Sequence, residues 1–211
     1  MAKHFEFTGD ERVFEGVTVH RIRALVDLPE LDVVAGDVGG WVESEDNVSD
    51  SAWVMGEAVV CQDARVMDSA VVSGNAVVSG QAKVQGKAKV NGSVTIMDNA
   101  QVCDDVELAG VITVSVNALV CGNALVTGEV LVTDNAQVRD DVEISGKVKF
   151  LGNAQVFGSA LISGSCRIED DAQVFEHAEL YGRVRVKDRA QVHGSAVVYG
   201  KVKIKGKSNV H

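Results

Sequence analysis

Residues 64–87 read ARVMDS AVVSGN AVVSGQ AKVQGK, which is four copies of one six-residue unit. The unit runs without interruption over residues 46–207 as 27 consecutive hexapeptides, and SNVH at 208–211 begins another. A period of six fits neither the 3.6-residue repeat of a helix face nor a heptad. Fixed short periods indicate a solenoid, and hexapeptides indicate a β-helix.

The positions within the unit explain how it folds. Position three is aliphatic in every unit apart from Phe150, and position one is mostly Ala. Both positions point to the same side of an extended segment, so they form the inward face. Position five is Gly in 16 units and Asp in eight, with Gln62, Val116 and Glu176 as the exceptions. Gly takes positive φ without steric cost and Asp tolerates it, so position five is the predicted corner.

Three short strands and three corners close a triangular coil, so one turn takes 18 residues. We number the three faces by their units: the first face has units beginning at Ala64, the second at Ala52 and the third at Ala58, each recurring every 18 residues. Residues 18 apart then stack in columns about one strand spacing, or about 4.8 Å, apart. We predict an all-β fold: a β-helix of about nine coils over 46–211.

The units AVVSGN, AVVSGQ and ALVTGE resemble the left-handed β-helix hexapeptide-repeat family over about four-fifths of the chain. A single-stranded, left-handed triangular prism is what this resemblance implies, because parallel crossovers are otherwise right-handed. FEFTG, HRIRAL and AGDVGGWVESEDNVS are similar to the N-terminal segment of a hexapeptide-repeat group of bacterial and prophage sequences. Members of that group are commonly labelled transferases or are unassigned, so the resemblance implies no mechanism.

Residues 1–45 do not fit the repeat and are the predicted N-terminal cap. Segments 3–8 and 17–25 alternate like strands, with GDERVFEG between them as a turn-rich connection. A β-helix exposes strand edges and an open apolar core at its ends, so we expect Trp41 to lie over the first coil. The Gly-rich GDVGG at 36–40 lacks the Lys and Ser/Thr of a phosphate-binding loop.

Composition narrows the class of protein. A net charge of −10 argues against a general nucleic-acid binder, and no run approaches the roughly 20 apolar residues of a membrane span. The start MAKHFEFTGDERV has no apolar signal-peptide core. The four Cys have neither metal-ligand nor secreted-framework spacing, which favours a reducing cytoplasm. We expect neither a metal nor a cofactor.

The charge is uneven along the chain. Eight Arg and Lys residues over 183–207, less Asp188, sum to +7, which leaves −17 for the remainder. The simplest interpretation is a solvated basic end. The alternatives are a docking patch for an acidic partner and a site at Arg183 and Arg185 where an oligomer holds a small anionic metabolite.

Columns on the outer surface predict ladders and stripes. On the first face, Phe157, Phe175, His193 and His211 are 18 apart and form a predicted aromatic stripe, and Cys103 is a vertical neighbour of Cys121. Stacked amides are predicted for two further columns: Gln137, Gln155, Gln173 and Gln191; and Asn99, Asn117, Asn135 and Asn153.

The third face begins without charge. Its position-two column contains Val59, Val77, Thr95, Thr113 and Leu131, and an uncharged sheet face of this size is a predicted contact surface. We therefore expect a homo-oligomer with this column in its interface. The trimer is favoured by the family resemblance and the triangular prism.

Enzymes of the fold that this family resembles fall into two classes. Acyltransferases use a His general base between subunits of a trimer and commonly extrude a loop over acyl-CoA, whereas the 162 repeat residues here contain no insertion. His177 and His193 are the candidate bases, with a surface or interface role as the alternative. Carbonic anhydrases of the γ type bind zinc through three His, and the usual close pair within one coil is missing. The acid pairs Asp104-Asp105, Asp140-Asp141 and Asp170-Asp171 are interpreted as solvated corners.

The interpretation we favour is a non-catalytic structural and binding protein that self-associates and presents a rigid surface to a protein partner. It is consistent with a phage or prophage origin. The absence of insertions over 46–207 favours it, since function in solenoids usually enters through loops or a concave surface. An acyl-CoA-dependent acyltransferase with an intersubunit site is the alternative, and capture of a small anion is a third.

Overall fold

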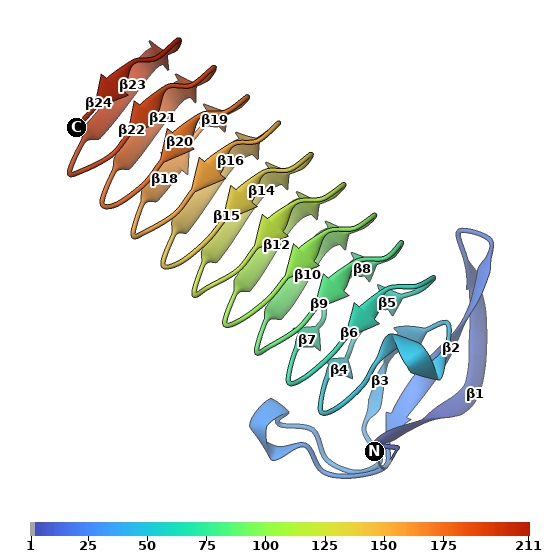
Figure 1. Ribbon diagram of the computed structural model, residues 1–211. Coiled ribbons are helices and arrows are strands. Elements are labelled where there is room, and N and C mark those ends of the chain that lie inside the picture. The colour runs from blue at the N-terminus through green and yellow to red at the C-terminus, as the bar shows by residue number, and fades with distance from the viewer. Residues whose placement is uncertain (1–2) are drawn as a thin grey trace.

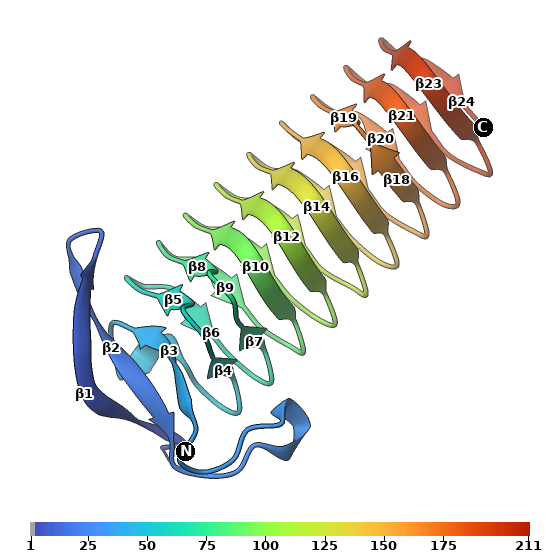
Figure 2. The ribbon, with the colours of Figure 1, turned by 180° about the vertical axis from the view of Figure 1, so that it is seen from behind.

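The computed structural model describes residues 3–211, which form a β-solenoid of about nine turns rising from an N-terminal β-rich segment (Figure 1). Figure 2 shows the same stack from behind, with the N-terminal segment at one end of the stack and the last coil at the other. Among the described residues, no helix is both long and apolar enough to cross a bilayer.

The N-terminal segment contains three strands and two short 3-10 turns. They are β1 (Phe5–Phe14), β2 (Val17–Ala24), η1 (Pro29–Leu31), β3 (Val38–Val42) and η2 (Glu45–Asn47). The predicted turn-rich connection between the first two strands was wrong, because β1 continues through Gly9 with a register shift between Phe7 and Glu11. The reversal falls at Glu15 and Gly16, both with positive φ.

The first face is a sheet of nine two-residue strands. They are β6 (Arg65–Val66), β9 (Lys83–Val84), β11 (Gln101–Val102), β13 (Leu119–Val120), β15 (Gln137–Val138), β17 (Gln155–Val156), β20 (Gln173–Val174), β22 (Gln191–Val192) and β24 (Asn209–Val210).

The second and third faces belong to one continuous sheet. Its short strands are β4 (Trp53–Val54), β5 (Val59–Val60), β7 (Val71–Val72), β8 (Val77–Val78), β18 (Leu161–Gly164) and β19 (Arg167–Ile168). Its eight-residue strands are β10 (Lys89–Ile96), β12 (Glu107–Val114), β14 (Leu125–Val132), β16 (Glu143–Phe150), β21 (Glu179–Val186) and β23 (Val197–Ile204).

Register confirms the predicted 18-residue turn. Parallel partners within the stack are 18 apart, as Lys89 with Glu107 and Glu107 with Leu125 illustrate. The inward positions are buried as expected, with Ala, Val, Ile and Leu forming one core along the stack. Phe150 takes an inward position among them and is fully buried.

The corners lie at position five and have the predicted backbone. Even the three exceptions to the Gly/Asp rule are left-handed there, with φ of 60° at Gln62, 64° at Val116 and 60° at Glu176. Between the second and third faces the corner column is Gly in every coil from Gly56 to Gly200. The eight-residue strands pass through this corner unbroken, because Gly bends an extended chain at a φ that side chains avoid.

The cap covers the first coil with residues other than the one predicted. Phe5, Ile22, Leu28 and Val33 join the core cluster of the solenoid, next to the buried Trp53 of the first coil. The ladder of parallel strands already begins at β3, where Trp41 is the register partner of Val59. Residues 38–42 thus form an extra rung below the first coil.

Trp41 does not lie over the open core, so that expectation was wrong. Its register makes it an outward position-two residue of the third face, and its side chain packs beside Val59 and Cys61. The guanidiniums of Arg12 and Arg21 lie 4.3 and 5.0 Å from the centre of its ring. The indole therefore anchors the β1–β2 hairpin to the side of the stack.

Candidate functional site

A concave basic surface lies on the corner between the second and third faces, over β19, β21 and β23. We call it the basic groove; its volume is about 480 Å³. Its polar lining consists of Ser165, Arg167, Arg183, Arg185, Lys201 and Lys203. Both residues predicted for anion binding, Arg183 and Arg185, are in this lining.

Strand register brings the cations together. Arg167 pairs with Arg185 and Arg185 with Lys203, while Arg183 pairs with Lys201 in the adjoining column. Partners on neighbouring parallel strands lie about 4.8 Å apart, and residues i and i+2 on one strand about 6.6 Å apart. The groove is thus a grid of five cations and one hydroxyl on three successive coils. Such close like charges repel unless counter-charges balance them.

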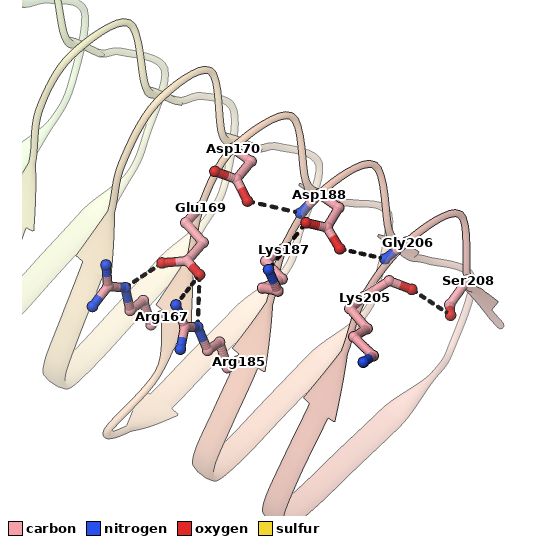
Figure 3. Close-up of polar contacts among 9 residues, drawn as sticks. All are labelled: Arg167, Glu169, Asp170, Arg185, Lys187, Asp188, Lys205, Gly206 and Ser208. Atoms are coloured by element: carbon pink, nitrogen blue, oxygen red, sulfur yellow. Dashed lines mark hydrogen bonds and ion pairs between the residues drawn. The ribbon is translucent and has the colours of Figure 1, made fainter.

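One buried carboxylate supplies part of that balance. Glu169 has a side chain only 7% exposed and bonds to the guanidiniums of Arg167 and Arg185 on adjacent coils (Figure 3). Arg185 Nε donates to its Oε1 at 2.6 Å. The same carboxylate thereby fixes two guanidiniums that would otherwise be free to rotate. Sequence reasoning missed Glu169: its position two residues after Arg167 and 16 before Arg185 places it near both cations but does not determine where its side chain points.

The other cations of the groove are not neutralised. Among residues 3–211, no carboxylate lies within ion-pair distance of Arg183, Lys201 or Lys203. All three side chains are exposed. They can therefore contact an anion without first breaking an ion pair.

The predicted aromatic stripe on the first face is confirmed. Phe157 and Phe175 stack with ring centres 4.9 Å apart, as do Phe175 and His193, and His193 and His211 are 5.8 Å apart. The guanidinium of Arg139 extends the column over Phe157 at 5.5 Å. The spacing is that of the strands themselves, so the stripe follows from the fold.

The two candidate general bases have different surroundings. His193 has its Nε2 2.6 Å from Asn209 Oδ1 and its Nδ1 3.7 Å from Glu176 Oε2. His177 is exposed, and within residues 3–211 its side chain has no hydrogen-bond or ion-pair partner. Nε2 of His193 is thus hydrogen-bonded and Nδ1 lies near a carboxylate, whereas nothing orients His177.

Cys103 and Cys121 are vertical neighbours, as predicted. Their sulfurs and a carboxylate oxygen of Asp104 all lie within 4.8 Å of one another. Burial raises the pKa of the Cys103 thiol to about 12, and it also raises the pKa of Cys121. Both thiols are therefore protonated at neutral pH, which disfavours a nucleophilic role. Asp104 already accepts a 3.0 Å hydrogen bond from the backbone of Gly122.

The predicted interface column needs one correction. Val59 is buried, because the β1–β2 hairpin packs Val19, Phe14 and Val17 against it. The remaining members are partly exposed and stack in register: Val77, Thr95, Thr113 and Leu131. We call these four residues the uncharged strip.

The Asn ladder is present as predicted, and the Gln ladder is present in part, since Gln137 has no side-chain hydrogen bond among residues 3–211. Hydrogen bonds of 3.1–3.2 Å join the four side chains Asn99, Asn117, Asn135 and Asn153. Asn153 in turn donates a hydrogen bond to Asp171 on the next coil. In the Gln column, bonds link Gln155, Gln173 and Gln191. These outward ladders link neighbouring coils, so we assign them to the solenoid and not to a binding site.

Comparison with known proteins finds no matching family model and no matching curated protein. The function is therefore argued from the surfaces and side chains described above.

Proposed function

We propose that the chain is a non-catalytic binding scaffold of the left-handed hexapeptide-repeat type that self-associates, as a trimer, through the uncharged strip. The observation that carries this proposal is a flat column of uncharged side chains on an unbroken stack. Val77, Thr95, Thr113 and Leu131 lie on successive coils, with the partly exposed Met97 beside them. Surfaces of this kind on a rigid support favour protein contacts.

The chain itself provides a precedent for covering this column. Its first member, Val59, is already buried by the apolar residues of the β1–β2 hairpin. Trp41 packs against the same apolar cluster, and its Nε1 donates a 3.1 Å hydrogen bond to Glu57. The four residues of the uncharged strip present the same kind of surface on the next four coils without a covering strand, and we propose that a second copy of the chain covers them.

The cysteine spacing supports a reducing, cytoplasmic location.

Two leucines on one strand provide a matched test. Leu131 belongs to the uncharged strip and Leu125 to the second face, and both are outward residues of β14. We expect Leu131→Lys to dissociate the oligomer in native mass spectrometry, because each copy would bury a charge at the interface. Leu125→Lys should leave the subunit count unchanged. A monomeric parent chain, or an L131K variant with the parent's subunit count, would overturn the proposal.

An acyltransferase built on His193 is the second candidate. The Glu176 carboxylate near His193 Nδ1 favours it, since a general base needs an orienting partner. Asn209 at 2.6 Å from Nε2 and the rings stacked on both sides argue against it, because Nε2 is already hydrogen-bonded and both faces of the imidazole are covered. Acyl transfer from acetyl-CoA that is lost in His193→Ala but kept in His177→Ala, with melting unchanged in both variants, would reverse this ranking.

A further inference from the structure

We propose that the basic groove binds a small ligand through a di- or triphosphate group, and that Glu169 is a positioning residue for that site. The groove residues all belong to one chain. This inference therefore does not depend on the self-association proposed above, and each can fail without the other.

The charge of the groove sets the charge of its ligand. Five cations less the single carboxylate of Glu169 leave a net +4. One phosphate monoester has a charge of only about −1.5 to −2. Several linked phosphoryl groups are needed to match the groove, whereas one phosphate or one carboxylate leaves most of its cations unpaired.

The side-chain chemistry points to phosphoryl oxygens. The planar guanidinium forks of Arg167, Arg183 and Arg185 are suited to bidentate contact with phosphate, and Lys201 and Lys203 add mobile point charges. The Ser165 hydroxyl lies in the same lining and adds a neutral donor. A rigid grid of this kind holds donors in place before the ligand arrives, which reduces the entropic cost of binding.

The dimensions exclude a long polyanion. The groove covers three coils, or about 10 Å along the stack axis. One coil further back the cation column continues with the exposed Lys149, and two coils back it is replaced by Leu131. Lys147, on the same coil as Lys149, is paired with Glu129 at 2.7 Å. The chain as a whole has a net charge of −10, so an extended nucleic acid would meet repulsion outside this small area.

The contacts of Glu169 distinguish a preorganised binding site from a surface that is only charged. Its carboxylate contacts both guanidiniums (Figure 3), and its side chain is only 7% exposed. If charge alone governed binding, removing this negative group would strengthen it. If Glu169 positions Arg167 and Arg185, Glu169→Gln should weaken binding even though the groove becomes more positive.

Isothermal titration with inorganic triphosphate, inorganic phosphate and citrate tests the ligand class. We expect triphosphate to bind at least about tenfold more tightly than phosphate, and citrate to bind about as tightly as phosphate. Only triphosphate is long enough to contact cations on several coils of the groove. Arg183→Gln should weaken triphosphate binding about tenfold, as loss of one charged hydrogen-bond donor does. Lys83→Gln removes the same charge from an exposed position on the first face and should change binding less than about twofold.

The outcomes that overturn the proposal are specific. They are equal affinity for the three anions, equal loss in Arg183→Gln and Lys83→Gln, tighter binding by Glu169→Gln, or no heat with millimolar triphosphate. Arg183 is exposed and free of ion pairs among the described residues, so R183Q keeps the fold and decides the question even where E169Q lowers the melting temperature.

Discussion

The carboxylate of Asp98 accepts a 3.0 Å hydrogen bond from the backbone N–H of Val116, the corner residue one coil later. The same bond recurs at other acidic corners, for example from Gly122 to Asp104 and from Gly158 to Asp140. Corner N–H groups face along the stack, and an acid in the left-handed conformation reaches the next one. The acidic corners of this chain thus act as structural caps for backbone donors.

Substituting a corner acid tests this role. We expect Asp104→Ala to lower the free energy of unfolding by about 2 kcal/mol, since it removes the hydrogen bond to the Gly122 N–H and puts Ala at a φ of 65°. The neighbouring Asp105 has no such bond among the described residues, so Asp105→Ala should cost less than about 0.5 kcal/mol. Urea unfolding of both variants gives the comparison, and equal losses would contradict the capping role.

The Gly column predicts a large effect from one methyl group. A Cβ at Gly128, where φ is 92°, would lie 2.5 Å from the carbonyl oxygen of Gly146. At Gly200, in the same column with a φ of 85°, a Cβ would meet nothing within 4 Å. Gly200→Ala should cost only the backbone strain of about 1–2 kcal/mol. Gly128→Ala should cost at least about 1 kcal/mol more in denaturant unfolding, because the clash adds to that strain.

Docking of the N-terminal hairpin should depend on pH through Glu57. Hydrogen bonds from Arg21 above all, and from Trp41 and Arg12, hold the pKa of Glu57 below its ordinary value of 4.5. A depressed folded-state pKa adds stability above pH 4.5, which is lost as the pH falls through the lowered pKa. Because this carboxylate is half exposed, we expect the effect to be small and salt-sensitive.

Tryptophan fluorescence between pH 6 and pH 2 measures this transition. Trp41 lies against Arg12 and Arg21, whereas Trp53 is buried in the core and acts as an internal reference. A Glu57→Gln variant should lack the acid shift in Trp41 emission. If that variant keeps the shift of the parent chain, Glu57 is not the group that titrates.

The stacked cysteines should react slowly with alkylating agents. Burial first, and then the neighbouring Cys121 and Asp104, raise the pKa of Cys103 to about 12. The thiolate fraction at pH 8 is therefore far smaller than that of a free cysteine with a pKa of about 8.5. Iodoacetamide labelling followed by mass spectrometry should show Cys103 modified much faster in denaturant than in the folded chain. Equal rates in the two states would contradict this.

The columns could be predicted from sequence because the repeat converts separation along the chain into contact in space. Once 18 residues make a turn, Phe157 must meet Phe175, Asn99 must meet Asn117, and Cys103 must meet Cys121. The corner conformations follow in the same way from Gly and Asp at position five. Each of these inferences needs only the period and the strand spacing.

The packing of the N-terminal hairpin and the contacts of Glu169 in the basic groove could not be predicted in this way. Trp41 and Val59 are covered by a hairpin whose residues have no periodic relation to the stack. Likewise, Glu169 contacts Arg167 and Arg185 only because of the rotamers of the three side chains. The 18-residue period places residues in columns but does not determine those rotamers.

The coil, its corners and the residues that stack follow from the repeat alone, because a strict period leaves one low-energy way to bury Ala and Val on the same side. Three-dimensional packing was needed to learn which part of the third face the hairpin covers and which of the groove's cations are neutralised. Those outcomes depend on docking and rotamers, where a difference of one or two side-chain contacts selects the arrangement.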